Sequence, residues 1–296
     1  MNQIIYPKKE KSNLPVKNIT CTGIDLGTTY TLFAIVDSSE VDLYQSNRIP
    51  VKFISIEQES PNEYDSTIFD EKVASIAAIY KGQPYVGNNL HHLKGQKDFI
   101  YKQNMFYNWK VELGINQVPM YPESVGNGLL DMPYKIASGI LKYCRKKSPH
   151  DLDEKLENTI VTVPASFHAN QREDIIKAID LSKISSNSGM LIDEPNAAFL
   201  GYFNRLNEEN KQKWANEVRN KNVLIVDFGG GTLDLSILNI DFRNDTGITI
   251  SNKAISRYND LGGHDIDILL AEEFIYPKFI EKFEELDNVG LSDLQD

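Results

Sequence analysis

Two distant segments carry the same chemically useful residue types in nearly the same order. Residues 25–29 read DLGTT, and residues 227–232 read DFGGGT. Each segment lies between two short apolar runs, which is typical of a tight turn joining two strands. Glycine lets backbone N–H groups approach an anion closely, threonine hydroxyls add donors, and a nearby aspartate can hold Mg²⁺ through water. Two such turns facing each other would clamp a magnesium-bound polyphosphate.

Either motif alone is also typical of an ordinary glycine-containing hairpin. The recurrence of the pattern after two apolar runs favours the phosphate-binding interpretation. Other phosphate-binding patterns do not fit this sequence. Residues 82–89 (GQPYVGNN) have the glycine spacing of a P-loop but lack its Lys-Ser/Thr pair, and no GxGxxG motif occurs.

Short apolar strands and amphipathic helices must position these turns. Strand pairs are predicted within 19–37 and 223–238, with single strands at TIVTVP and GMLID. Helices are predicted over 133–147, from ANQRED onward with Asn170 as N-cap, after the Glu194-Pro195 step, and after residue 262. A further helix is predicted around 73–80, and Pro277 should end or kink the last helix. Alternating helices and strands with added strand–turn–strand pairs predict a mixed α/β protein.

Composition excludes several other classes of protein. The chain has 296 residues, 41% apolar and 25% charged, with a net charge of −11. These values are typical of a globular protein and argue against a general nucleic-acid surface. The aromatic and lysine-rich segment 88–115 is therefore interpreted as packed structure and not as a base-stacking surface. Two cysteines and no long apolar run predict an intracellular, cytoplasmic protein without a membrane span.

The motifs together resemble one known family. GIDLGTTYTLFAIVD is similar to the first phosphate segment of the actin-like ATPases. VTVPASFHANQREDIIKAI, LIDEPNAAFLGY, VLIVDFGGGTLDLSIL and LGGHDID resemble successive segments of the DnaK-type 70-kDa heat-shock chaperones. Sugar kinases and actin share the Asp-Gly hairpins but not this series. The resemblance extends from about residue 20 to residue 270.

The resemblance implies roles for the matching residues. Asp25 and Asp227 would hold Mg²⁺ through water, and Glu194 would help to position the metal or the attacking water. The implied catalytic residues are Asp25, Glu194, Asp227 and Thr232. The implied nucleotide-contacting residues are Gly27, Thr28, Thr29, Tyr30, Gly229, Gly230, Gly231, Thr232, Gly262 and Gly263. Pro164 and Arg172 match a pair implicated in interdomain signalling, although a strand stop and a surface charge are the simpler interpretations.

The implied fold is that of the actin-like (ribonuclease H-like) ATPases, with two lobes of mixed sheets flanked by helices. Residues 1–18 are predicted to be a flexible polar tail, and residues 19–203 a first lobe with an inserted subdomain at about 40–130. Residues 204–222 are predicted to be a polar insertion or linker helix. Residues 223–296 are predicted to begin a second, incomplete lobe.

Two features depart from the family pattern. The family has a lysine shortly after a Val-Gly step, and VGNNLHHLK places His91 at the ungapped position and Lys94 three residues later. Loss of one transition-state donor costs roughly 10²–10³ in rate, so slow hydrolysis is expected unless Lys94 substitutes. The chain also ends before the family's adenosine-binding segment and peptide-binding domain, which suggests a fragment or a shortened protein.

Three functions follow from these patterns. The first is an ATP-binding, slowly hydrolysing domain that uses ATP/ADP and Mg²⁺ and signals to a peptide-binding domain outside this chain. A J-domain cochaperone and a nucleotide-exchange factor are the implied partners. The second is a nucleotide-sensing scaffold or regulator with little hydrolysis, favoured by His91. The third is a small-molecule kinase, which the chaperone-like connecting segment disfavours.

Overall fold

The computed structural model describes residues 20–37, 49–115, 130–149, 156, 158–184, 190–206, 208–218, 221–243, 247–256 and 261–282. The predicted tail at 1–18 and the end of the chain at 283–296 lie outside these ranges. Among the described residues, no helix combines the length and the apolar character that a membrane crossing requires.

The largest sheet has six strands in the order β11-β10-β1-β2-β3, with β6 also pairing with β2. Its strands are β1 (Thr20–Leu26), β2 (Tyr30–Asp37), β3 (Lys52–Phe53), β6 (Lys72–Ala74), β10 (Thr159–Val163) and β11 (Met190–Asp193). β1 is parallel to β10 and antiparallel to β2, and β10 is parallel to β11. The sheet is therefore mixed, as the sequence predicted.

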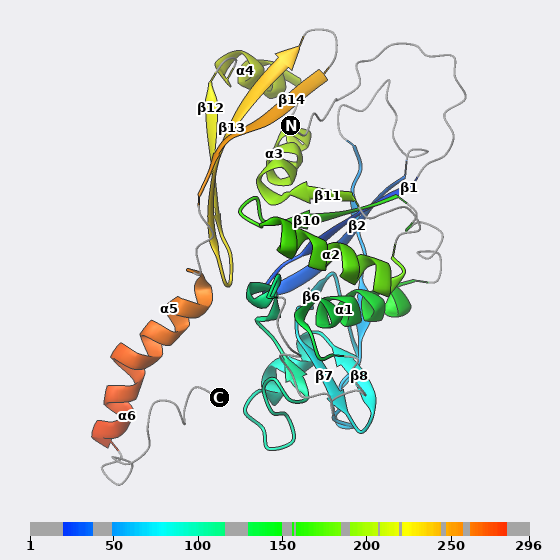
Figure 1. Ribbon diagram of the computed structural model, residues 1–296, viewed down its shortest axis with the longest axis vertical. Helices are drawn as coiled ribbons and strands as arrows, with labels where there is room; N and C mark the ends of the chain where they lie inside the picture. Colours follow the sequence, from blue (N-terminus) through cyan, green and yellow to red (C-terminus); the bar gives the residue numbers. More distant parts are fainter. Residues whose placement is uncertain are drawn as a thin grey trace.

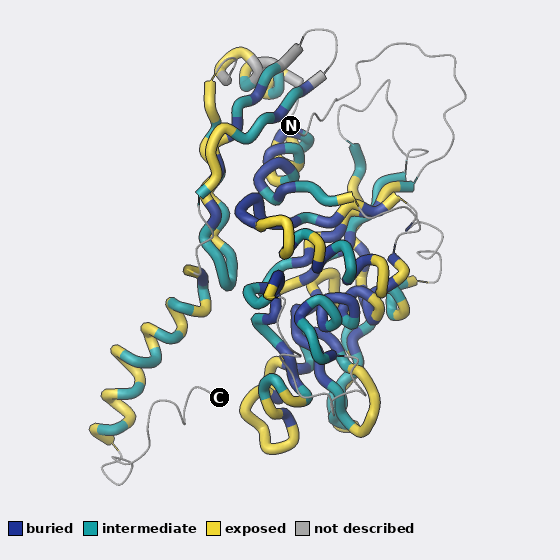
Figure 2. Tube along the Cα trace, viewed as in Figure 1, coloured by how far each residue is buried: buried dark blue, intermediate teal, exposed yellow. Residues whose placement is uncertain are grey.

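Helices α1 (Pro133–Lys147) and α2 (Ala169–Ser182) lie side by side over one face of this sheet (Figure 1). Alternate residues of a strand point to opposite faces, so Ile24 and Leu26 enter the core while Gly23 and Asp25 face the other side. Ile136, Ile140 and Cys144 of α1 are fully buried against this core, at the spacing of one helical face. Figure 2 shows the buried residues concentrated in these layers.

A small three-stranded sheet lies between β6 and α1 in the sequence. It has the order β8-β7-β9, with β7 (Ala77–Tyr80), β8 (Gln83–Val86) and β9 (Met105–Phe106), and it is accompanied by the 3₁₀ helices η2 (Asn88–Leu93) and η3 (Trp109–Glu112). Strands β4 (Ile56–Gln58) and β5 (Ile68–Asp70) form a separate pair. The aromatic segment is packed structure, because Phe99, Phe106 and Trp109 are buried.

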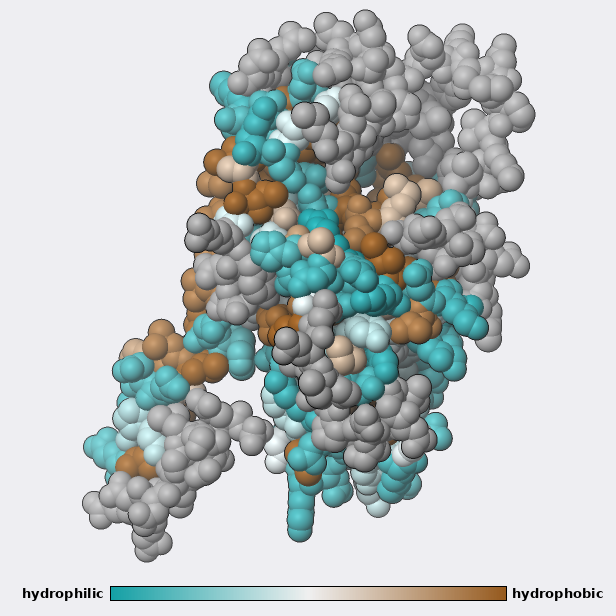
Figure 3. Space-filling view, viewed as in Figure 1, coloured by the Kyte–Doolittle hydropathy of each residue, from teal (hydrophilic) through white to brown (hydrophobic). Residues whose placement is uncertain are grey.

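A second three-stranded sheet, β12-β13-β14, is formed by Asn222–Phe228, Leu233–Arg243 and Gly247–Ile255. Helix α3 (Glu194–Arg205) packs Phe199 and Phe203 against Leu238 and Ile250 on one face, and α4 (Glu208–Val218) adds Trp214. The opposite face carries exposed apolar side chains, among them Leu224, Val226, Phe228 and Ile237, and Figure 3 shows apolar surface over β12 and β13. Helix α5 (Gly263–Leu270), the π-helical turn η6 (Ala271–Ile275) and α6 (Tyr276–Lys282) follow.

Three local predictions need correction. Residues 73–80 form parts of β6 and β7 instead of a helix, because β6 pairs with β2 and β7 pairs with β8. The N-cap of α2 is His168, whose N–H donates to Gln171 Oε1 at 2.9 Å, while Asn170 donates to the Gly114 carbonyl. Pro277 does not end its helix, and the alternative that it kinks the helix stays a prediction. It lies in α6, directly after the π-helical turn, where wider winding accommodates its missing N–H.

Candidate functional site

The two glycine-containing turns close in the same way. Gly27 N donates to the Tyr30 carbonyl at 3.0 Å between β1 and β2, and Gly229 N donates to the Thr232 carbonyl at 2.8 Å between β12 and β13. Each turn is therefore tight and lies at the end of a pair of antiparallel strands.

The tertiary structure brings these two turns into contact with each other. A Cβ built on Gly230 would lie 1.9 Å from Thr29 Oγ1, and one on Gly231 would lie 3.0 Å from Thr28 Cγ2. Real Cβ atoms do not approach other atoms as closely as 1.9 Å. Packing against Thr29 therefore favours glycine at position 230, independently of any anion.

A cavity of about 950 Å³ opens between the two turns. Most of the predicted site residues line it: Asp25, Gly27, Thr28, Thr29, Tyr30, Glu194, Asp227, Gly229, Gly230 and Thr232. Its other walls are apolar residues of β1, β2, β10 and α3, including Ala34, Ile160 and Ala197. A volume of this size is within the range of small-molecule and cofactor sites.

Three predicted site residues support the cavity without lining it. Gly231 contacts Thr28, as described above. Gly263 N donates to the Gly229 carbonyl at 3.0 Å, and a Cβ on Gly262 would lie 2.5 Å from Gly231 N. Gly262 and Gly263 therefore pack against the backbone of the second turn without lining the cavity.

Among the described residues that line the cavity, the cation is Lys110, which the sequence motifs did not predict. Its Nζ donates to Glu194 Oε1 at 2.9 Å, and only 6% of the lysine side chain is exposed. Lys110 lies in η3 directly after the buried Trp109 and lines the cavity with Glu194. Its signal in the sequence is weak, because it is one lysine of several in an aromatic segment and its partner is 84 residues away.

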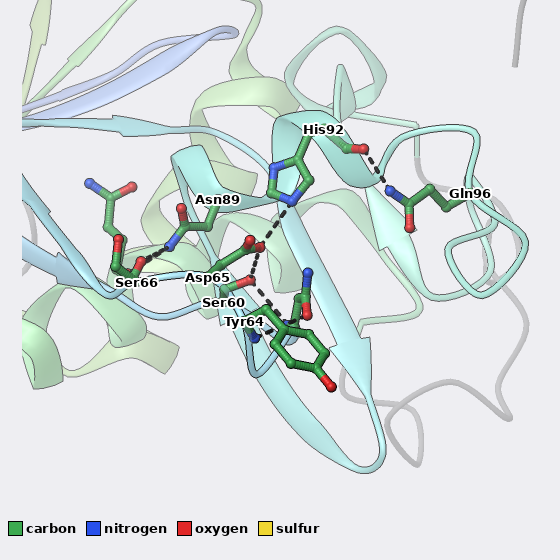
Figure 4. A network of polar contacts seen from close by, with 9 residues as sticks. Ser60, Tyr64, Asp65, Ser66, Asn89, His92 and Gln96 are labelled. Atoms are coloured by element: carbon green, nitrogen blue, oxygen red, sulfur yellow. Dashed lines mark hydrogen bonds and ion pairs between the residues drawn. The ribbon is translucent and has the colours of Figure 1, made fainter.

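The cavity lining does not include the two candidates for the family's lysine, His91 at the ungapped position and Lys94 as its substitute, and which residue takes that place stays a prediction. The His91 ring lies 6.3 Å from the Tyr30 ring, with its pKa lowered chiefly by burial, and Lys94 Nζ lies 4.3 Å from the Tyr107 ring centroid. The neighbouring His92 belongs to a surface network, in which its Nε2 lies 3.0 Å from Asp65 Oδ2 (Figure 4).

The carboxylates of the cavity influence one another. Burial raises the pKa of Glu194; Lys110 opposes this effect, and Asp25 and Asp227 add to it. Burial also raises the pKa of Asp227, with Asp234 and Asp25 adding to the effect. Like charges held together in a partly desolvated cavity favour a bound cation.

This donor set fits Mg²⁺ held through water. The described residues contain no cluster of three or more His, Cys, Asp or Glu side chains arranged to ligate a metal directly. Mg²⁺ usually keeps several waters and uses one or two carboxylates together with substrate phosphates. Thr162 Oγ1 donates to Asp25 Oδ1 at 2.8 Å and so holds that carboxylate from the neighbouring strand β10.

Hydrogen bonds connect the main sheet to the second sheet beside the cavity. Arg172 Nη2 donates to the Pro164 carbonyl at 3.3 Å and pairs with Asp193 at 2.7 Å. Asn252 Nδ2, on β14, donates to the other oxygen of Asp193 at 3.0 Å. Arg172 is therefore part of a network that reaches from the Pro164 turn to the second sheet through the residue preceding Glu194.

A second connection joins Ser166 to Asp234. Ser166 Oγ donates to Asp234 Oδ1 at 2.5 Å, and both residues are buried. Neither residue belongs to the two motifs, 25–29 and 227–232, that predicted phosphate binding from the sequence. Their pairing across 68 positions is visible only in the folded chain.

The fold and the cavity define an α/β protein in which two facing glycine-containing hairpins enclose a carboxylate-rich site. A family model described as "Hsp70 protein" matches residues 21–289. The chain therefore belongs to the Hsp70 family, in its N-terminal region, which implies an actin-like ATPase fold.

Curated relatives give the same assignment at low identity. The chain is 28% identical to a protein named "Heat shock cognate HSP70 protein" from Trypanosoma brucei brucei over 84% of this chain and 35% of the relative. It is 29% identical to "Chaperone protein HscA" from Buchnera aphidicola over 89% of this chain and 39% of that protein. It is 28% identical to "Ribosome-associated molecular chaperone SSB" from Candida glabrata over 85% and 38%. The chain thus spans well under half the length of these relatives.

Proposed function

We propose that this chain binds Mg-ATP between its two hairpins and hydrolyses it slowly, as the nucleotide-binding domain of a chaperone. The observation that carries the proposal is the convergence of both hairpins and the Lys110–Glu194 pair on one cavity of about 950 Å³. Two anion-binding turns, two flanking aspartates and one buried cation suit a magnesium-bound polyphosphate better than an uncharged ligand.

The proposed roles follow from position and chemistry. Thr28 and Thr29 would donate hydrogen bonds to the phosphates from one side, and the backbone of Gly229 and Gly230 from the other. Mg²⁺, when bound, would neutralise charge on the phosphate oxygens, and Asp25 and Asp227 would hold it through water. Phosphoryl transfer to water depends mainly on such positioning and charge stabilisation.

Lys110 and Glu194 are suited to the hydrolytic step. The ammonium group of Lys110 would stabilise the charge on the terminal phosphate, and the carboxylate of Glu194 would orient the attacking water. As the water oxygen bonds to the γ-phosphorus, the bond to the ADP oxygen breaks, ADP leaves, and the proton of the water passes to an oxygen of the released phosphate. A lysine in the cavity supports hydrolysis, whereas His91 at the family's lysine position favours the non-hydrolysing scaffold.

Coupling to a peptide-binding domain, a J-domain cochaperone and a nucleotide-exchange factor is part of the proposal. The Pro164–Arg172–Asp193–Asn252 network supports it, because it connects the two sheets directly behind Glu194. Nucleotide bound beside Glu194 would act on this network through the neighbouring Asp193, which offers a route for a signal to leave the site.

Calorimetric titration of the chain with Mg-ATP tests the proposal. The wild-type chain should bind, and Asp227→Ala should lose binding because one of the two magnesium-holding carboxylates is gone. Asp180→Ala removes an exposed aspartate of α2 as a matched control and should bind as the wild type does. Absence of binding by the wild type, or equal binding by Asp227→Ala, would contradict the proposed site.

Phosphate release measured on the same samples separates the hydrolase from the scaffold. The wild type should release phosphate slowly from Mg-ATP, and Lys110→Met should release none while still folding. Tight ATP binding without any phosphate release would favour the nucleotide-sensing alternative.

A further inference from the structure

Ser75 occupies a junction between the first hairpin and the turn that carries Lys110. It follows β6 directly and is fully buried. Its N–H donates to the Thr29 carbonyl at 2.8 Å, and its Oγ donates to the Gly27 carbonyl at 2.7 Å. Its own carbonyl accepts a hydrogen bond from Trp109 Nε1 at 3.0 Å. The N–H, the hydroxyl and the carbonyl of Ser75 therefore each take part in a hydrogen bond.

The hydroxyl contacts fix the direction of each hydrogen bond. Thr31 Oγ1 lies 3.0 Å from Ser75 Oγ, and both residues are fully buried. Because the single hydroxyl proton of Ser75 goes to Gly27, Thr31 must be the donor to Ser75. Removing the Ser75 hydroxyl would deprive the part-buried Gly27 carbonyl and the fully buried Thr31 hydroxyl of this partner, which is costly.

These bonds also decide which groups of the hairpin face the cavity. The carbonyl oxygens of Gly27 and Thr29 are directed toward Ser75, which does not line the cavity. A carbonyl oxygen carries partial negative charge and would repel a phosphate. By holding both carbonyls away from the cavity, Ser75 leaves the donors of the turn available to an anion.

The third bond carries the connection to Lys110. Trp109 is 1% exposed, and its indole bond to Ser75 holds the start of η3. The end of the same turn is held by Asp174 Oδ2, which accepts from Gly114 N at 2.9 Å. Lys110 lies between these two anchors, so its reach toward Glu194 depends on the position of Trp109.

We propose that Ser75 is a positioning residue that sets the spacing between the phosphate-facing hairpin and Lys110. It does not line the cavity and would act through Gly27, Thr29 and Trp109. The effect of Ser75 on nucleotide binding rests on the proposed function of the cavity. The connection that Ser75 makes between the first hairpin and η3 does not depend on that function.

Hydrogen exchange of the unliganded chain tests the mechanical connection. Ser75→Ala should speed amide exchange roughly tenfold in peptides covering both 26–32 and 105–113, because one lost hydroxyl loosens two turns. Ser182→Ala is the matched control, since Ser182 is equally buried and donates to the Ile179 carbonyl at 2.7 Å in α2, outside the cavity lining. Faster exchange in only one of the two turns, in neither, or equally with Ser182→Ala would overturn the proposal.

Nucleotide titration supplies a second test with a different readout. Ser75→Ala should weaken Mg-ATP binding roughly tenfold and leave AMP binding unchanged, because AMP lacks the outer phosphates that the hairpin and Lys110 would hold. Equal weakening for both nucleotides would indicate general loosening and overturn the positioning role. If the wild-type chain binds neither nucleotide, the proposed function fails and the exchange experiment alone decides the role of Ser75.

Discussion

The buried pair between Lys110 and Glu194 gives the sharpest quantitative prediction. Only 6% of the lysine side chain and 17% of the glutamate side chain are exposed, and the charged atoms lie 2.9 Å apart. Breaking a buried ion pair by removing one partner costs about 3–5 kcal/mol, because the other charge stays buried without compensation. Lys110→Met and Glu194→Gln should therefore each lower the free energy of unfolding by about 3 kcal/mol, the low end of that range, because Glu194 retains some solvent.

The double variant should recover much of that loss, since neither charge remains. Urea unfolding of the wild type, the two single variants and the double variant, monitored by circular dichroism, gives the coupling free energy between Lys110 and Glu194. We expect a coupling of at least about 2 kcal/mol. The exposed Lys177–Glu173 pair of α2 is the control, with side chains 42% and 64% exposed, and its coupling should stay below about 1 kcal/mol.

The pH dependence of this cycle has a definite sign. Burial raises the pKa of Glu194 and Lys110 opposes the effect, so loss of Lys110 should raise that pKa further. In Lys110→Met, lowering the pH protonates Glu194 and removes its uncompensated charge, so the stability deficit should shrink. The deficit of Glu194→Gln should not shrink, because glutamine does not titrate, whereas the raised pKa of Glu194 makes protonation stabilise the folded wild type as the pH falls. Additive single effects, within about 0.5 kcal/mol, would refute the reasoning. Phosphate release should be lost in the double variant even though its stability returns.

Three further predictions concern other parts of the site. Asp227→Asn should raise the melting temperature without nucleotide at pH 7, because burial raises the pKa of Asp227 and its charge is disfavoured in the folded state. This gain in melting temperature should fade as the pH approaches the ordinary aspartate pKa of about 3.9. The stabilisation of the wild type by Mg-ATP should be lost in this variant. Gly262→Ala should destabilise the chain and weaken Mg-ATP binding in calorimetry, because its Cβ would lie 2.5 Å from Gly231 N, whereas Gly263→Ala meets only contacts of 3.8 Å or more and should bind normally. His91→Lys should leave phosphate release unchanged in a steady-state assay, because His91 does not line the cavity; a clear increase would mean that this position does reach the phosphates.

Local patterns in the sequence predicted the elements around the site well. The strand–turn–strand pairs at both hairpins are confirmed, as are the helix at 133–147 and the strand-to-helix step at Glu194, because apolar periodicity and glycine or proline signals act over a few residues. The family assignment was also available from motif order. The boundaries of the predicted lobes and the roles of individual site residues remain predictions.

The tertiary structure decided what the local patterns left ambiguous. The apolar run at 73–80 suits a helix or strands about equally, and pairing with β2 and β8 selected strands. Lys110 has no local signature, since its position in the cavity depends on Trp109 reaching Ser75 and on Glu194, which is 84 residues away. Local sequence determines which backbone conformations are favourable, whereas tertiary packing determines which lysine side chain lies in the partly desolvated cavity. That choice depends on contacts between distant segments, which exist only once the chain has folded.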